Sequence, residues 1–199
     1  TLLNIANNGR EYVISFIEAY TELFFKPESI RDYIPKRTCG MTDLAIIKYA
    51  VDQAAKDKTP EEREKIVKKF VDLVQNKFEQ NFSGNQELAV GIKEFLDTLK
   101  SRGDVIIGLC TGNLTKIGEA KLKKAEILDY FDESARGFGW CECRNELLKK
   151  VIESVEAKYK IKLEKVIHIG DTCSDVAAAE SVGAIPIVIK QWNMEILLL

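Results

Sequence analysis

The stretch KVIHIGDTCSDVAAAESVGAIPIVI, residues 165–189, decides the fold class because it combines two strand patterns with one helix pattern. Lys165–Ile169 and Ile185–Ile189 are runs of largely apolar and β-branched residues with the length of strands. Ser174–Val182 lies between them, begins with small helix-forming residues and is followed by Gly183, a typical helix stop. The stretch therefore predicts the order strand, helix, strand.

The same alternation is present upstream of this stretch. Val105–Cys110 is a continuous apolar run of strand length, and a polar loop and a Lys-rich helical segment follow it as far as about Ala125. Arg144–Lys158 is also helical, with apolar residues on one face. Strands that alternate with helices predict an α/β fold, with a Rossmann-like parallel sheet and helices on both of its faces.

The first part of the chain differs, because Arg10–Phe82 has a helical pattern throughout. Residues 12–24 and 44–54 carry apolar side chains at the spacing of one helix face. Thr59-Pro60-Glu61-Glu62 is the clearest helix start, with a Thr to cap the helix, a Pro in its first position and a Glu in its third. No flexible linker follows, so we expect this helical part to pack against the α/β part.

Length and composition exclude several classes of protein. The chain has 199 residues, of which 46% are apolar and 30% charged, and its formal net charge is -2. We therefore expect no nucleic-acid partner and no membrane partner, since there is no basic surface and no apolar stretch near the roughly 20 residues of a membrane helix. Five irregularly spaced cysteines, with Cys141 and Cys143 as a lone C-x-C pair, predict free thiols and a cytoplasmic location.

Two carboxylates lie in the loop after the strand at residues 165–169. Asp171 would sit at the tip of the strand, and Asp175, one helical turn later, could point back toward it. Open α/β sheets bind ligands beyond the carboxyl ends of their strands, and paired carboxylates suit Mg²⁺. We therefore expect Asp171 and Asp175 to bind Mg²⁺. The alternative is that Asp171 or Ser174 only caps the following helix.

Thr111-Gly112-Asn113 forms a second candidate site, because it follows the apolar Val105–Cys110 strand. A hydroxyl with neighbouring backbone amides at a helix start can bind an anion, and Gly112 allows a phosphate to approach closely. All three residues are therefore candidate phosphate ligands. The alternative is a turn in which Asn113 caps the helix.

Together these residues resemble the haloacid dehalogenase superfamily, and within it the phosphoglycolate-phosphatase-like branch. Gly170–Asp175 is similar to the acidic fourth motif, Gly-Asp-x-x-x-Asp, and Thr111 is similar to the Thr or Ser of the second motif. Arg144 is the best match to the basic third motif, which is usually Lys. Arg binds phosphate as a fork where Lys acts as a point charge. The resemblance implies catalytic roles for Thr111 and Arg144, although Arg144 could instead be a surface residue at its helix start.

The resemblance also implies a domain organisation. Members of this branch carry a helical cap inserted after their first motif, so residues 8–85 would form an all-helical cap and residues 86–199 the α/β core. Residues 1–7 would be a remnant of the first motif loop. Thr42 and Asp43 could face the substrate from the cap and determine specificity, or Thr42 could only cap its own helix.

The first motif of the family is a hydrophobic strand that ends in Asp-x-Asp-Gly-Thr-Leu, in which the first Asp is the nucleophile and the second the general acid/base. The chain begins Thr1-Leu2-Leu3. We therefore expect both carboxylates and the first central strand in an upstream segment. That strand would lie between Val105–Cys110 and Val166–Ile169, and without it the sheet would have a gap of roughly 9 to 10 Å between two unpaired edges.

The resemblance thus implies a Mg²⁺-dependent phosphomonoester hydrolase that acts on a small phosphorylated metabolite through an aspartyl phosphate. A phosphomutase or a dehalogenase on the same fold is an alternative. A dehalogenase needs no Mg²⁺, so the pair of Asp171 and Asp175 argues against it. A non-catalytic binding protein that has lost the nucleophile is a third possibility, from a different class.

Overall fold

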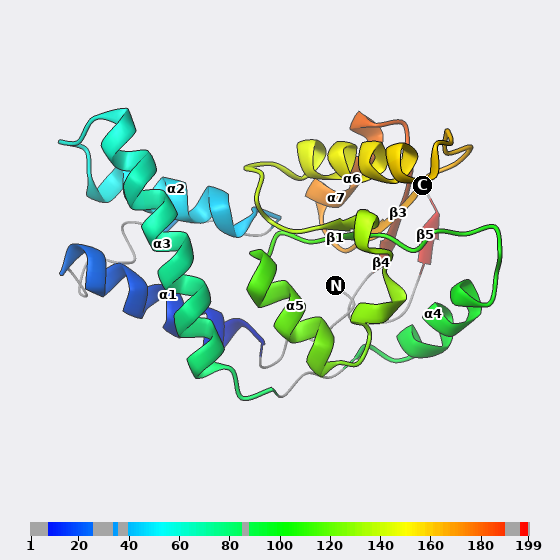
Figure 1. Ribbon diagram of the computed structural model, residues 1–199, viewed down its shortest axis with the longest axis horizontal. Helices are drawn as coiled ribbons and strands as arrows, with labels where there is room; N and C mark the ends of the chain where they lie inside the picture. The colour runs from blue at the N-terminus through cyan, green and yellow to red at the C-terminus, as the bar shows by residue number, and fades with distance from the viewer. Residues whose placement is uncertain (1–7, 26–33, 36–39, 85–87, 190–195, 199) are drawn as a thin grey trace.

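The structure is a computed structural model that describes residues 8–25, 34–35, 40–84, 88–189 and 196–198 (Figure 1). The first three helices, α1, α2 and α3, are called the helical layer. The elements that follow them form the α/β part. In chain order the elements are α1 (Asn8–Phe24), α2 (Asp43–Ala54), α3 (Pro60–Asn81), α4 (Ile92–Lys100), β1 (Leu109–Cys110), α5 (Thr115–Lys124), the 3-10 turns Leu128–Tyr130 and Glu133–Ala135, β2 (Arg136–Gly137), α6 (Arg144–Tyr159), β3 (Ile167–Gly170), α7 (Cys173–Ser181), β4 (Ile185–Ile189) and β5 (Ile196–Leu198).

The described strands form two sheets. β1 and β2 pair in parallel, with Leu109 opposite Arg136, and β3 and β4 pair in parallel, with His168 opposite Pro186. β5 runs antiparallel to β4. The sequence predicted a parallel sheet, so this antiparallel pair was not expected. The reason is the connection of residues 190–195, which is too short for the crossover of a dozen or more residues that a parallel pair needs.

Helices lie on both sides of these strands, which confirms the predicted Rossmann-like α/β class. Figure 1 shows α6 on one side of β1, and α4 and α5 on the other. α6 contacts β1 and β2, while α7 contacts β3, β4 and α6. The strand predicted at Val105–Cys110 is shorter than expected, because only Leu109 and Cys110 are paired.

Among the described strands, none pairs β1 to β3. The apolar side chains on β3 are therefore poorly covered for a parallel strand: Ile167 is 53% exposed, although such strands are normally buried on both faces. Ile185, its partner on β4, is 39% exposed. Among the described strands, the edge of β1 away from β2 and the edge of β3 away from β4 are therefore both unpaired.

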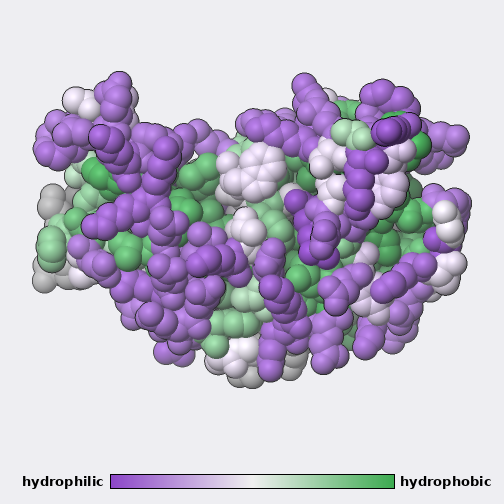
Figure 2. All heavy atoms as spheres, in the orientation of Figure 1, coloured by the Kyte–Doolittle hydropathy of each residue, from purple (hydrophilic) through white to green (hydrophobic). Residues whose placement is uncertain are grey.

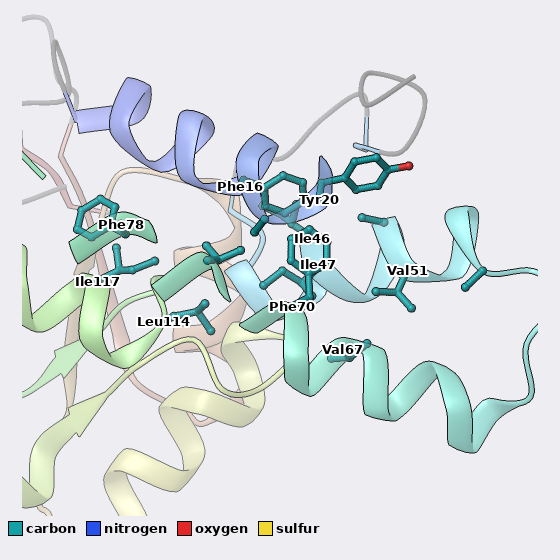
Figure 3. Close-up of a cluster of buried hydrophobic side chains, with 14 residues drawn as sticks. Phe16, Tyr20, Ile46, Ile47, Val51, Val67, Phe70, Phe78, Leu114 and Ile117 are labelled. Atoms are coloured by element: carbon teal, nitrogen blue, oxygen red, sulfur yellow. The ribbon is translucent and has the colours of Figure 1, made fainter. Parts of the chain in front are cut away.

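The helical layer has its own aromatic core (Figure 3). Phe70 of α3 is completely buried, and its ring centroid lies 4.9 Å from that of Phe16 on α1. Leu114 and Ile117, at the start of α5, belong to the same buried cluster. The helical layer and the α/β part therefore pack against each other through this hydrophobic cluster. The sequence predicted such packing, because no flexible linker separates the two parts.

The start of α3 is fixed by a capping box, as its sequence predicted. The Thr59 hydroxyl accepts the Glu62 amide at 3.2 Å, and the Glu62 carboxylate accepts the Thr59 amide at 2.8 Å. Thr59→Ala should lower the free energy of unfolding by about 1 kcal/mol in urea denaturation, since one helix amide loses its acceptor. Thr98→Ala, on the exposed face of α4, is the control and should not lower it. If Thr98→Ala lowered the free energy of unfolding as much as Thr59→Ala, the stabilising role of the capping box would be contradicted.

Figure 2 shows hydrophilic side chains spread over the visible face, with hydrophobic residues between them rather than in one broad patch. None of the helices in the described part of the chain is both long and apolar enough to cross a membrane.

Candidate active site

Asp175 is the centre of the polar site at the end of β3. It is 4% exposed, and its Oδ2 accepts the Thr172 hydroxyl at 2.6 Å, the Thr172 amide at 3.0 Å and the Asp171 amide at 3.3 Å. Gly170 allows this fold of the loop, because a Cβ there would overlap the Asp175 side chain. Thr172 is the N-cap of α7, so neither Asp171 nor Ser174 has the capping role considered above.

Arg144, at the first position of α6, reaches across to this loop. Its Nη1 donates to Asp175 Oδ1, and the side chain is only 17% exposed, so it is not a surface residue. His168 of β3 is buried, with Nε2 at 3.5 Å from the same Asp175 oxygen. The side chains of Arg144, His168 and Thr172 come from different parts of the fold and converge on the Asp175 carboxylate.

These contacts set the charge of the site. Burial raises the pKa of Asp175, but the nearby His168, the hydrogen bonds from Thr172 and the charge of Arg144 outweigh it, so the pKa lies below the ordinary Asp value. Asp175 is therefore ionised at neutral pH, as a partner of Arg144 must be. Both of its oxygens already receive donors from the protein.

The site offers carboxylate oxygens as possible ligands for a metal ion. Among the described residues, no group of three or more His, Cys, Asp or Glu side chains is arranged to hold an ion. Asp171 and Asp175 nonetheless have the chemistry that suits Mg²⁺, which is commonly held by one or two carboxylates together with water and substrate oxygens.

The Thr111-Gly112-Asn113 loop lies beside Arg144. A Cβ on Gly112 would stand 3.5 Å from Arg144 Nη2 and 2.8 Å from the Met41 carbonyl oxygen, so the loop backbone fills the space between the two. On its other side, a Cβ on Gly139 would overlap the Gly112 carbonyl. The predicted phosphate loop and Arg144 are therefore neighbours.

The amides of this loop are partly engaged within the protein. The Thr111 amide donates to the Gly137 carbonyl at 2.9 Å, and the Asn113 amide lies 3.3 Å from the Thr111 hydroxyl. Asp43 accepts the Leu114 amide, and Asn113 does not cap α5, whose N-cap is Leu114. Of the four backbone amides from Thr111 to Leu114, that of Gly112 is the one for which the described residues provide no hydrogen-bond acceptor.

Thr42 and Asp43, at the start of α2, contact the α/β part directly. Thr42 caps α2 by accepting the Ala45 amide at 3.2 Å, and its hydroxyl also donates to the Cys141 carbonyl at 2.7 Å. Asp43 is 5% exposed and bonds to the loop before α5. Gly40 packs against Ser174 and Thr172. Residues 40–43 thus contact three polar segments of the α/β part: the loop before α5, the segment at Cys141 and the start of α7.

Sequence reasoning did not find two of these contacts. The hydrogen bond of Asp43 to Leu114 joins residues 71 positions apart, and Thr-Asp before a helix indicates only a local cap. His168 is a buried residue within a strand pattern, and its approach to Asp175 has no signal in the sequence. Only the three-dimensional arrangement shows these residues around the site.

Cys110, a thiol near Arg144, does not offer an alternative nucleophile. Cys110, Cys141, Cys143 and Cys173 are free thiols, and Cys39 lies outside the described residues. Burial raises the pKa of Cys110, which follows Leu109 on β1, to about 12, despite the opposing charge of Arg144. A thiol with that pKa is protonated at neutral pH and does not attack an ester.

Comparison with known proteins identifies the family. The sequence matches the family model of the haloacid dehalogenase-like hydrolases over residues 2–183, so the chain belongs to that family of hydrolases. No curated protein is similar enough in sequence to match.

Solved structures share the fold. A haloacid dehalogenase-like hydrolase from Streptococcus pneumoniae is 18% identical, with a TM-score of 0.50 over 92% of this chain and 80% of its own. A candidate phosphatase from Clostridium difficile is 17% identical, with a TM-score of 0.52 over 89% of this chain and 78% of its own. At these identities the likeness concerns the fold alone.

Proposed function

We propose that the protein is a Mg²⁺-dependent phosphomonoester hydrolase of the phosphoglycolate-phosphatase-like branch, acting on a small phosphorylated metabolite. The observation that carries the proposal is the position of Arg144, which lies between the Gly112 backbone and the buried carboxylate of Asp175. A guanidinium held in that way presents its remaining donors to an anion bound at the neighbouring loop. The candidate-phosphatase description of the Clostridium difficile structure agrees with this proposal.

The chain's own residues have distinct tasks in this proposal. Thr111, the Gly112 amide and Arg144 bind the phosphoryl oxygens and neutralise the charge that develops on them. Asn113 supports the loop. Asp171 and Asp175 are the residues that would hold Mg²⁺, which supplies further charge stabilisation when bound.

The attacking carboxylate belongs, by resemblance, to the strand between β1 and β3. The two unpaired edges and the 53% exposure of Ile167 support a strand at that place. A central strand there would cover the exposed apolar side chains of β3 and complete the backbone hydrogen bonds of both edges. It would also bring its carboxyl end to the loops that carry Thr111 and Asp171, where ligands of such sheets bind.

The domain organisation is part of the same proposal. Residues 8–85 form the cap, with α1, α2 and α3, and residues 86–199 form the core. The contacts of residues 40–43 with the polar loops support a cap that covers the site and excludes water from the bound phosphate. Thr42 and Asp43 belong to the part of that cap that contacts the proposed phosphate loop, together with Met41.

Asp171→Asn in the complete protein tests the metal assignment. Turnover of p-nitrophenyl phosphate in the presence of Mg²⁺ should fall by about 100-fold or more, because the amide replaces a charged ligand of the cation. Asp104→Asn is the control, since Asp104 is exposed, pairs with Arg102 and lies in the segment before β1, away from the candidate site.

Chelation separates the candidate activities. EDTA should abolish the turnover, and added Mg²⁺ should restore it, whereas a dehalogenase would be insensitive. Full activity of Asp171→Asn would remove the metal assignment, and turnover that persists in EDTA would overturn the Mg²⁺ dependence.

A further inference from the structure

Asp43 makes a set of contacts that its place at the start of α2 does not require. Its Oδ2 accepts the Leu114 amide at 2.8 Å and lies 3.4 Å from Asn113 Nδ2. Its own amide donates to the Gly112 carbonyl at 2.8 Å. One residue of the helical layer thus binds three consecutive residues of the Thr111–Leu114 segment.

Helix capping does not explain this carboxylate. Thr42 already caps α2, and the carboxylate of Asp43 faces another element, the start of α5. A buried carboxylate is costly unless its charge is compensated, so a neutral residue would serve better if only packing were required. The role of the Asp43 charge is therefore expected in the Thr111–Leu114 segment that it contacts.

We infer that Asp43 is a positioning residue, which holds the Thr111-Gly112-Asn113 loop from the helical layer in the conformation that receives a phosphoryl group. The inference rests on the proposed phosphatase function and adds to it a residue that orders the loop without touching the substrate. By binding the Gly112 carbonyl and the Leu114 amide, Asp43 fixes the loop backbone that directly follows the Gly112 amide, in the segment that lies beside Arg144.

A second layer of contacts supports this role. Lys121 of α5 is buried, and its Nζ donates to Asn113 Oδ1 at 3.1 Å, while Asn113 Nδ2 faces Asp43. Asn113 therefore connects a buried cation to a buried anion across the loop. Tyr12 of α1 is the titratable group that faces Asp43 from the other side.

The ionisation of Asp43 provides a readout. Burial raises the pKa of Asp43 to about 6, although the Leu114 amide, the Lys121 charge, Asn113 and Tyr12 oppose the rise. The carboxylate form, which makes the stronger hydrogen bond to an amide, therefore predominates above about pH 6, and the protonated form below it. The loop should be held more firmly on the alkaline side of that transition.

The experiment compares Asp43→Ala and Asp43→Asn in the complete protein, with Asp52→Asn as the control. Asp52 is on the same helix, but its carboxylate forms an exposed pair with Arg63. Three quantities are measured between pH 5 and 8: the affinity for inorganic phosphate, the turnover of p-nitrophenyl phosphate, and the hydrogen exchange of the Leu114 amide. Circular dichroism verifies that each variant is folded.

We expect Asp43→Ala to weaken phosphate binding by about 10-fold or more and to speed Leu114 exchange, because a charged acceptor is removed. Asp43→Asn keeps an acceptor oxygen, so it should retain most of the affinity but lose the transition near pH 6. Asp52→Asn should match the wild-type protein in all three measurements.

The outcomes separate this inference from the proposed function. Wild-type affinity and wild-type Leu114 exchange in folded Asp43→Ala would overturn the role of Asp43 and leave the phosphatase proposal intact. A wild-type protein that neither binds phosphate nor hydrolyses the ester would overturn the proposed function. If Asp43→Ala does not fold, a pH transition that is unchanged in Asp43→Asn would overturn the inference.

Discussion

Asp175→Ala is expected to lower the free energy of unfolding by about 3 to 5 kcal/mol and to remove activity, because it leaves a buried guanidinium without its partner. The Arg144 side chain is 17% exposed and that of Asp175 is 5% exposed, so water cannot replace the lost carboxylate well. The Thr172 hydroxyl and amide lose their acceptor as well. Urea denaturation followed by circular dichroism measures the loss.

Asp52→Ala is the matched control, since it breaks the exposed pair with Arg63 and should change stability by less than about 0.5 kcal/mol. A loss below about 1 kcal/mol for Asp175→Ala would show that Arg144 finds another partner or water.

The lowered pKa of Asp175 also gives the wild-type protein a pH dependence. The folded pKa lies below the unfolded value of about 3.9, so the stabilisation by this group is fully present above about pH 4 to 5. It is lost as the pH falls from there toward the folded pKa. The difference in stability between wild type and Asp175→Ala should therefore shrink on acidification.

Phe70→Ala should have an effect of similar size, about 3 to 5 kcal/mol, through the core of the helical layer. The Phe70 ring is completely buried, with centroids of Phe16 at 4.9 Å and of Tyr20 at 6.3 Å. Its removal leaves a cavity between α1 and α3, which packing closes only in part. Phe25→Ala is the control, because Phe25 is 83% exposed.

Thermal and urea denaturation, followed by circular dichroism, measure both variants. A change of about 0.5 kcal/mol or less is expected for Phe25→Ala. Equal effects of the two substitutions would contradict the packing shown in Figure 3. Separate transitions for Phe70→Ala would indicate that the helical layer can unfold before the rest.

Elements with local signals were predicted well from the sequence. The Thr59 capping box starts α3 at Pro60, and the β-branched run Ile185–Ile189 is β4 without change. Such signals act within a few residues, so tertiary contacts have little to alter. Elements that depend on a partner were predicted less well: β2 at Arg136–Gly137 was not expected at all, since a strand of that length is defined only by its pairing with β1.

The candidate site shows the same division. The Gly-Asp-x-x-x-Asp pattern indicated that Asp171 and Asp175 share a loop, because the spacing is one helical turn. It could not indicate that Arg144 occupies Asp175 Oδ1, since that contact spans 31 positions and depends on how α6 packs against α7.

The contacts of residues 40–43 have a consequence for how the helical layer would move. Gly40, Thr42 and Asp43 each contact a different polar loop, so rotation of α2 away from the α/β part would break all three contacts together. A half-released state would leave the buried carboxylate of Asp43 without its donors, which is unfavourable. We therefore expect opening to be cooperative, with only two populated arrangements, in which admission of a ligand and disordering of the loops are a single event.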